Sequence, residues 1–206
     1  MSSTARARVA VLLSGRGSNY RALQEAVDQR RLPAEIVVVV SNEPEAVGLE
    51  IARAAGVPAH AIPHRGEPSR ASHEEKVRDV LERAGAEWIC LAGYMRLLSG
   101  AFVDRYRWRV LNIHPSLLPA FPGLDVHRKA LEHGVRISGC TVHLVDAGLD
   151  SGPIVVQRAV PVLDDDSPES LAARILEEEH RAYPDALERL LTRRWVLEGR
   201  RLRFRP

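Results

Sequence analysis

Cysteine is scarce in this sequence, whose 206 residues include only Cys90 and Cys140. Both cysteines lie in apolar runs, and their spacing is not C-x-x-C, so they predict neither a disulfide framework nor a cysteine zinc site. We expect buried thiols in a protein of a reducing compartment, and therefore a cytoplasmic location.

Long apolar runs and an excess of one charge are also lacking. The first apolar run, residues 9–13, is shorter than the core of a signal peptide and far shorter than the about 20 residues of a membrane-spanning helix. Lys and Arg number 29 against 27 Asp and Glu, so the net charge of +2 does not indicate a nucleic-acid partner. The basic residues between 193 and 205 are interpreted as a solvated segment, with contact to RNA as the alternative. We expect neither membrane nor nucleic acid as a partner, and a monomer or homodimer.

Short apolar runs, one of them made of β-branched residues, alternate with helical segments in the first half of the chain. The runs are residues 9–13, 36–40, 88–92 and 109–113, and the helical segments are residues 19–30, 45–55 and 69–85. Continuous apolar strands separated by helices predict a parallel sheet with helices on both faces, because right-handed crossovers place the helices there.

The second half has a different pattern. Residues 139–145 and 153–158 are typical of strands, and no helical segment separates them, so an antiparallel pair is expected. A long amphipathic helix should begin at Ser167 and Pro168, since serine caps helices and proline suits the first turn. A hairpin around Glu198 and Gly199 should follow. We predict a single doubly wound α/β domain, mostly parallel, with antiparallel strands in its C-terminal half.

A glycine-containing turn, residues 14–19, joins the first predicted strand to the first predicted helix. Glycine permits tight turns, and a helix N-terminus offers N–H groups and the positive end of the helix dipole, so the turn suits a phosphate. Ser18 and Asn19 add side-chain donors. The alternative is an ordinary turn capped by Ser18 or Asn19. The spacing is not G-x-G-x-x-G, so a dinucleotide site is not supported.

Asn112 and His114 stand two residues apart at the end of a predicted strand, so their side chains should leave the same face of the sheet. Pro115 ends the strand there. The carboxyl ends of strands in open α/β sheets are where ligands bind. A carboxamide can donate to a developing oxyanion, and an imidazole can donate and move protons, so the pair suits acyl chemistry.

Asp150 is a third candidate, because a carboxylate beside an imidazole favours the imidazolium form. The sequence does not place Asp150 beside His114, and a turn-forming aspartate is the alternative. Ser116 and Ser151 lack the G-x-S-x-G elbow of a serine nucleophile, so direct transfer between two bound substrates is favoured. No H-E-x-x-H motif or cysteine–histidine cluster appears in the sequence, so no metal is expected.

Four segments, residues 14–19, 92–98, 112–119 and 148–153, occur in the order found in the phosphoribosylglycinamide formyltransferase family of purine biosynthesis. The chain resembles that family from about Val9 to Leu191. The family transfers a formyl group from 10-formyltetrahydrofolate to the amine of glycinamide ribonucleotide. The resemblance implies one formyltransferase domain over residues 1–206, with a phosphate-binding half at about 8–110 and a catalytic and folate-binding half at about 111–206.

The resemblance also implies roles for individual residues. Asn112 and His114 would stabilise the tetrahedral oxyanion, and Asp150 would keep His114 protonated and assist proton transfer, directly or through water. The residues implied to bind the ribonucleotide are Gly17, Ser18, Asn19 and Glu179. The residues implied to bind the folate are Arg70, Met95, Arg96, Leu97, Leu98 and Asn112, with loop 146–150 closing over the pterin.

Several of these positions have competing interpretations. Core packing is the alternative for Met95, Leu97 and Leu98. His143 matches a family histidine near the site, and a structural hydrogen bond is equally compatible with its pattern. Some relatives have histidine where this chain has Asp125, so the roles of Asp125 and His127 stay open.

Formyltetrahydrofolate hydrolase, which resembles the chain over the same catalytic residues, is the closest rival function. That enzyme usually has an additional N-terminal regulatory domain, whereas the first strand here starts by Val9. Methionyl-tRNA formyltransferase is similar in its catalytic half and has an extra RNA-binding domain. A non-catalytic nucleotide-binding module would use only the glycine loop and would leave Asn112, His114 and Asp150 unexplained.

Overall fold

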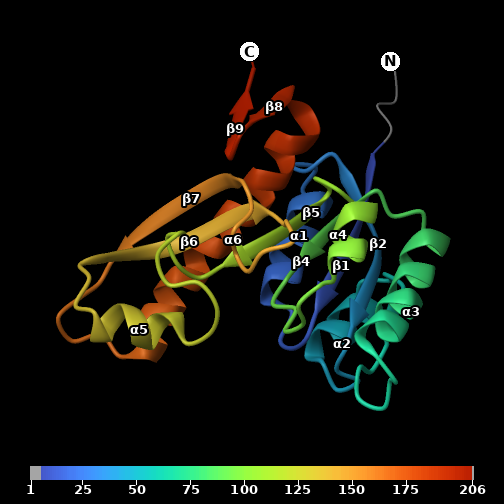
Figure 1. Cartoon of the computed structure of the whole chain (residues 1–206), viewed down its shortest axis with the longest axis horizontal. Coiled ribbons are helices and arrows are strands. Elements are labelled where there is room, and N and C mark those ends of the chain that lie inside the picture. The colour runs from blue at the N-terminus through green and yellow to red at the C-terminus, as the bar shows by residue number, and fades with distance from the viewer. Residues whose placement is uncertain (1–5, 206) are drawn as a thin grey trace. The chain divides into compact units, whose positions relative to one another are not determined.

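The computed structural model describes residues 6–205, which form two compact units with their boundary between Leu111 and Asn112. Figure 1 labels the helices and strands of both units. Strand β5 (Val110–His114) begins in the first unit and ends in the second. The expectation of a single domain remains a prediction.

Parallel strands form the centre of the first unit. β1 (Ala7–Leu13) pairs in parallel with β2 (Ala34–Ser41) and with β4 (Trp88–Leu91), and the short strand β3 (Ala59–Ala61) adds to the far side of β2. β1 is buried from Val9 to Leu13, as a strand covered on both faces must be. The predicted parallel sheet is confirmed, whereas β3 was not predicted.

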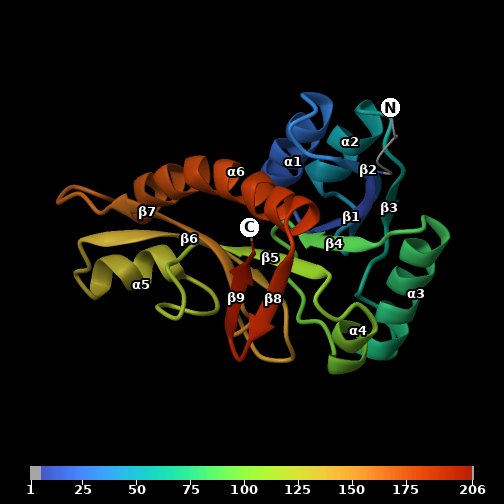
Figure 2. The same ribbon diagram turned by 90° about the horizontal axis from the view of Figure 1, so that it is seen from above.

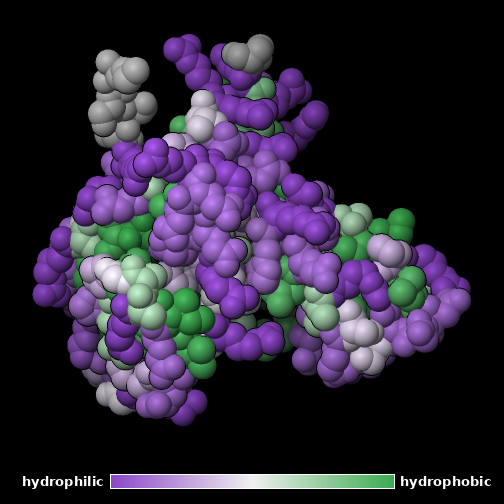
Figure 3. Space-filling model, turned by 180° about the vertical axis from the view of Figure 1, so that it is seen from behind, coloured by the Kyte–Doolittle hydropathy of each residue, from purple (hydrophilic) through white to green (hydrophobic). Residues whose placement is uncertain are grey.

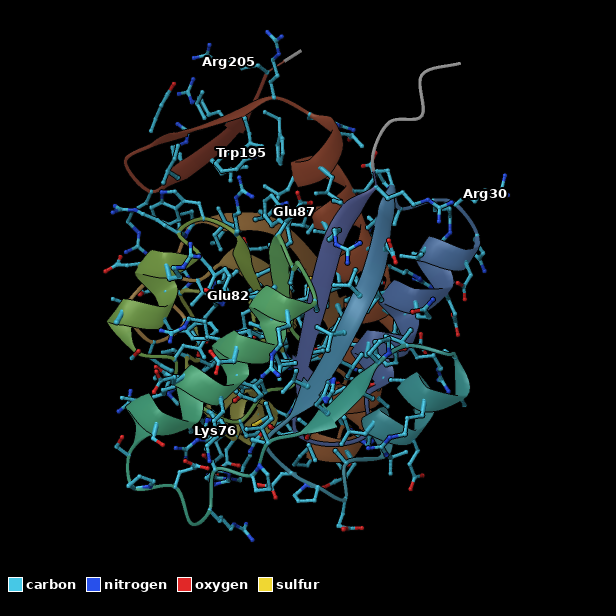
Figure 4. All side chains as sticks on the ribbon, turned by 90° about the vertical axis from the view of Figure 1, so that its right-hand side faces the viewer. Arg30, Lys76, Glu82, Glu87, Trp195 and Arg205 are labelled. Carbon is cyan, nitrogen blue, oxygen red and sulfur yellow. The ribbon has the colours of Figure 1, made fainter. Side chains whose placement is uncertain are left out.

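Helices cover both faces of this parallel sheet. α1 (Ser18–Asp28) and α2 (Val47–Ala54) lie on one face, while α3 (Arg70–Arg83) and α4 (Gly100–Arg105) lie on the other (Figures 2 and 4). α3 begins where the Ser69 hydroxyl accepts a hydrogen bond from the Ser72 N–H at 3.1 Å, which satisfies one of the free donors of the first turn. The doubly wound arrangement predicted from the alternating pattern is confirmed.

Antiparallel pairing dominates the second unit. The end of β5 lies beside β6 (Ile137–Leu144), and β6 pairs antiparallel with β7 (Ile154–Pro161), as predicted. The predicted hairpin also forms, from β8 (Trp195–Glu198) and β9 (Arg201–Phe204). β9 joins β7 in parallel through Ile154 and Arg201.

Helix α6 (Pro168–Thr192) supplies most of the cover for these strands and runs along β6 and β7 (Figure 2). Ser167 caps it as predicted, because its hydroxyl accepts from the Ser170 N–H at 3.2 Å. Its buried face includes Leu171 and Ile175, and burial of each such side chain stabilises the unit by about 2 kcal/mol. A shorter helix, α5 (Val126–Glu132), packs beside α6. Trp195 of the hairpin, labelled in Figure 4, donates from its indole nitrogen to the Leu190 carbonyl at 3.3 Å.

Both cysteines are buried free thiols, as expected. Burial raises the pKa of Cys140 to about 12, so this thiol stays protonated and unreactive near neutral pH. Across residues 6–205 there is no helix with the length and apolar character needed to span a membrane. The face drawn in Figure 3 is mostly hydrophilic, with separate hydrophobic patches.

Candidate active site

The end of β5 brings two polar side chains into a cluster in the second unit. Asn112 is half-buried and His114 is buried. His143 of β6 and Asp150 of the following loop complete the cluster. His143 contacts Asn112, and Asp150 faces both histidines. Asn112, His114 and Asp150 are the residues predicted to be catalytic, and the structure brings them together.

Both ring nitrogens of His114 face hydrogen-bond acceptors. Its Nε2 lies 2.9 Å from the Phe121 carbonyl, and its Nδ1 lies 3.4 Å from Oδ2 of Asp150. A carbonyl and a carboxylate can only accept, so both contacts are satisfied together only by the doubly protonated imidazolium. The His114 side chain is 7% exposed, and a charge so buried is tolerated only when it is paired. The geometry therefore suits a positively charged His114 beside an ionised Asp150.

Asp150 is held in an unusual backbone conformation. Its φ of 49° lies in the left-handed region, which is uncommon for residues other than glycine. Its Oδ2 accepts from the Gly123 N–H at 2.9 Å as well as facing His114. The turn itself is formed by Asp146, whose Oδ1 accepts from the Gly148 N–H at 3.0 Å and the Ser151 hydroxyl at 2.6 Å. Asp146 thus has the turn-forming role considered for Asp150, leaving Asp150 free to face the histidine.

His143 fixes the orientation of the Asn112 carboxamide. The Nδ1 of His143 lies 3.0 Å from the Leu144 carbonyl, which can only accept, so the proton of the neutral ring sits on Nδ1. Its Nε2 then has a lone pair and accepts from Nδ2 of Asn112 at 3.2 Å. Burial lowers the pKa of His143, which favours this neutral form. Asn112 keeps a second N–H for another acceptor.

A partly buried hydrogen-bond network, which was not predicted, shapes the loop after β5. The Thr141 hydroxyl donates to the Ser116 carbonyl at 2.7 Å and accepts from the Leu118 N–H at 3.0 Å. Gln157 donates to the same hydroxyl at 3.0 Å. These contacts hold the segment that ends at Phe121, whose carbonyl faces His114. No sequence pattern indicated that Thr141 and Gln157 hold this loop, because their hydrogen-bond partners lie far from them along the chain.

Asp125 and His127 lie at the start of α5. Asp125 precedes the helix in a left-handed conformation with φ of 58°, and its carboxylate pairs with Arg128 at 3.4 Å. Burial lowers the pKa of His127, and a positive charge on nearby His114 lowers it further. His127 is therefore expected to be neutral when His114 is charged.

The glycine loop belongs to the first unit, where Gly17 is the residue before α1. Its φ of 72° favours glycine, and a Cβ at this position would lie 2.6 Å from the Cα of Gly48. The Gly48 N–H donates to the Gly15 carbonyl at 3.0 Å, so the loop and the start of α2 are bound backbone to backbone. Ser18 and Asn19 lie inside the first turn of α1, so the idea that one of them caps the helix is wrong.

The residues expected at the folate site also lie in the first unit. Met95 is 66% exposed and Leu97 is 62% exposed, so core packing is excluded for these two side chains. Leu98 is half-buried, and the Nε of half-buried Arg96 has no hydrogen-bond partner among the described residues. Arg70 is the exposed first residue of α3. The Ser14 hydroxyl accepts from the Met95 N–H at 2.8 Å and so ties this segment to the glycine loop.

Glu179 of α6 is buried at 6% exposure in the second unit. Within residues 6–205, no group of three or more histidine, cysteine, aspartate and glutamate side chains is arranged to hold a metal ion. The folate is a substrate of the predicted reaction and not a resident cofactor.

Two cavities differ in their relation to these residues. The larger, of about 810 Å³, lies in the first unit around the start of β2, and none of the predicted site residues lines it. The smaller, of about 410 Å³, lies in the second unit and has Asp150 in its wall. The residues that line this smaller cavity are Leu118, Pro119, Asp150, Gly152, Ile154, Arg200, Arg201 and Leu202. The smaller cavity is the one adjacent to the polar cluster, because Asp150 lies in its wall.

The Asn112 carboxamide contacts the His143 imidazole, and the Asp150 carboxylate lies 3.4 Å from His114 and 3.8 Å from His143. Such a set of groups is suited to acyl transfer. Comparisons with known proteins agree with this class. The profile of the family described as "Formyl transferase" matches residues 7–187. A phosphoribosylglycinamide formyltransferase from Escherichia coli (strain K12) is 40% identical over 93% of this chain and 88% of that protein. The chain therefore belongs to the formyl transferase family, in its phosphoribosylglycinamide formyltransferase branch.

Two further relatives set the extent of the similarity. The crystal structure of glycinamide ribonucleotide transformylase 1 from Symbiobacterium toebii matches with a TM-score of 0.95 and 48% identity, covering 98% of this chain and 95% of that one. The trifunctional purine biosynthetic protein adenosine-3 of Drosophila pseudoobscura pseudoobscura is 51% identical over 91% of this chain. The chain spans only 14% of the length of that insect protein.

Proposed function

We propose that this chain transfers the formyl group of 10-formyltetrahydrofolate to the amine of glycinamide ribonucleotide, a step of de novo purine biosynthesis. Membership of the family supports the reaction class. The observation on which the proposal rests most is the contact of His114 with Asp150 at 3.4 Å, with the opposite ring nitrogen of His114 bound to the Phe121 carbonyl.

The reaction is a direct attack. The amine nitrogen of the ribonucleotide forms a bond to the formyl carbon, and the carbonyl oxygen becomes the oxyanion of a tetrahedral intermediate. The bond from that carbon to N10 of the folate then breaks, and N10 takes up the proton that the attacking amine loses. The products are the formylated ribonucleotide and tetrahydrofolate, so neither an enzyme nucleophile nor an oxidant is needed.

His114 and Asn112 stabilise the oxyanion in this scheme. The Nδ1–H of His114 is only weakly engaged by Asp150 at 3.4 Å, so it is available to the developing negative charge. Asn112 offers the N–H that His143 does not use. Asp150 stabilises the imidazolium form of His114 and accepts the proton of the amine, directly or through water, before it passes to N10.

The ribonucleotide phosphate is assigned to the start of α1. Gly17, Ser18 and Asn19 lie where the helix dipole is positive, and Gly17 has no side chain to block an anion. Glu179, buried on α6, is assigned to the glycinamide end of the same substrate, whose amine is a natural partner for a carboxylate.

The folate is assigned to exposed residues of the Met95–Leu98 segment, to Arg70 and to Asn112. Exposed Met95 and Leu97 offer apolar surface for an aromatic ring, and Arg70 and Arg96 offer positive charge for the folate carboxylates. Loop 146–150 closes over the pterin in this proposal. A cytoplasmic location accompanies the proposed function and is supported by the two buried free thiols.

The test is whether tetrahydrofolate release depends on the ribonucleotide. Purified protein with 10-formyltetrahydrofolate should release tetrahydrofolate only when glycinamide ribonucleotide is added, and formylated ribonucleotide should appear in equal amount. Equal release without the ribonucleotide would identify a hydrolase instead. Binding of the ribonucleotide with no release under any condition would identify a non-catalytic nucleotide-binding module.

A further inference from the structure

The β8–β9 hairpin lies beyond residues 7–187, which match the family profile, yet it contacts the loop that contains Asp150. We propose that Arg200 of this hairpin is a positioning residue that holds the Asp150 loop, residues 146–152, in its active geometry. The inference rests on the proposed function, because it assigns to Arg200 an effect on catalysis through Asp150.

The strand register places the hairpin next to the catalytic cluster. Ile154, the first residue of β7, pairs with His143 of β6 on one side and with Arg201 of β9 on the other. His143 is the residue that orients Asn112. The first residue of β9 is thus only one strand away from the cluster, and Arg200 immediately precedes it.

Arg200 contacts the loop directly. Its Nη2 donates a hydrogen bond to the carbonyl of Ser151, the residue after Asp150. On the other side, Gly152 packs so tightly that a Cβ there would lie 1.7 Å from the Leu144 carbonyl oxygen. Asp150, with its left-handed φ of 49°, lies just before these two anchored residues. Loss of the Arg200 contact would remove one of the restraints that keep this disfavoured conformation in place.

The cavity behind the loop explains why one hydrogen bond matters there. Asp150 and Gly152 form one part of its wall, and Arg200, Arg201 and Leu202 form another, around about 410 Å³ of space. A segment that borders open volume on one side lacks the close packing that fixes side chains in a core. Polar contacts such as that of Arg200 with Ser151 therefore hold the loop.

The test compares two arginines of the same hairpin. Arg200→Ala removes the contact with Ser151, whereas Arg203→Ala removes an arginine that pairs with Glu198 within the hairpin at 2.9 Å. We expect kcat for formyl transfer to fall about tenfold in Arg200→Ala, the effect of losing about 1.4 kcal/mol from one charge-assisted hydrogen bond. KM for the ribonucleotide should stay unchanged. Arg203→Ala should match the wild type, and Arg200→Lys should recover part of the loss because lysine can donate one hydrogen bond.

A double variant separates positioning from a general structural effect. If Arg200 acts through Asp150, Arg200→Ala should cause no further loss of kcat when Asp150 is already Asn, whereas damage to the fold would lower kcat in both backgrounds. Equal kcat for Arg200→Ala and Arg203→Ala in an otherwise active enzyme would overturn this inference alone. A wild-type protein without formyl transfer would instead overturn the proposed function.

Discussion

The glycine loop of the first unit and the polar cluster of the second unit are built in opposite ways. The loop depends chiefly on close backbone packing, since a Cβ on Gly17 would lie only 2.6 Å from the Cα of Gly48. The cluster depends on side chains, since His114 and His143 are buried, Asp150 is half-buried, and each of the three faces a hydrogen-bond acceptor or donor. The backbone of the glycine loop suits the binding of an anion, which needs N–H donors. The side chains of the polar cluster suit proton transfer and the stabilisation of charge.

The difference predicts how each region should fail. A change in the cluster removes stabilisation that the transition state needs, so it should lower kcat with little effect on KM. A change in the glycine loop alters the backbone that would hold the phosphate, so it should raise KM and reduce folding stability. Four predictions test this contrast, first those that concern kcat, from the larger effect to the smaller, and then those that concern folding stability, in the same order.

An effect as large as any expected here is predicted for His114→Gln. The variant loses the imidazole that stabilises the oxyanion in the proposed mechanism, and kcat for formyl transfer should fall about a thousandfold, since general acid–base and oxyanion groups each contribute at this level. Steady-state kinetics measure the change, and His60→Gln on exposed β3 provides a matched histidine control. A variant with more than a tenth of wild-type kcat would show that the chemistry lies elsewhere.

A smaller effect is expected at His143, which orients Asn112 and does not itself contact substrate in the proposed mechanism. His143→Leu removes the acceptor for the Asn112 N–H and should lower kcat about tenfold, the effect of about 1.4 kcal/mol. His143→Gln retains an oxygen that can accept the same hydrogen and should keep most of the activity. Equal kcat for the two variants would contradict the orienting role.

The glycine loop is tested by a pair of glycines with nearly equal φ. Gly17 has φ of 72° and Gly56 has φ of 73°, but a Cβ on Gly17 would overlap Gly48, whereas a Cβ on Gly56 meets nothing within 4 Å. We expect Gly56→Ala to cost about 1 kcal/mol of unfolding free energy and Gly17→Ala about 3 kcal/mol. Only Gly17→Ala should raise KM for the ribonucleotide. Equal losses of stability by urea unfolding would show that the contact with Gly48 is unimportant.

The smallest predicted effect concerns pH. Burial lowers the pKa of His143 and of His127 below that of the unfolded chain, so the unfolded state binds protons more readily than the folded state. The two neutral histidines therefore contribute fully to the free energy of unfolding above about pH 6.5. This contribution is lost as pH falls toward their pKa in the folded state, by at most about 1.4 kcal/mol per pH unit for each histidine. Urea unfolding between pH 7 and pH 5.5 should show a smaller decrease in His143→Gln than in the wild type. An equal or larger decrease would contradict the buried neutral histidine.

The strands and the long helix could be predicted because their signals are local. A β-branched run marks β2, a short apolar run marks β5, and Ser167 with Pro168 marks the start of α6. β3 was missed because Ala59, His60 and Ala61 include no β-branched residue. α4 was missed because it is six residues long and begins with glycine.

The contacts within the cluster could not be predicted from the sequence, because its members lie far apart along the chain. His143 and Asn112 are separated by 31 residues, and no pattern indicates that one orients the other. The choice between Asp146 and Asp150 as the turn-forming residue depends on backbone angles that neither residue type determines. Resemblance to a family supplied the residues, whereas their geometry required the fold.

Asp150→Asn tests the central claim most directly, because it removes one charge and leaves the side chain the same size. In the proposed mechanism Asp150 stabilises the His114 imidazolium and assists proton transfer. We expect kcat for formyl transfer to fall about a thousandfold, with KM for the ribonucleotide and the free energy of unfolding close to those of the wild type. Near-normal kcat in a folded Asp150→Asn protein would contradict the account.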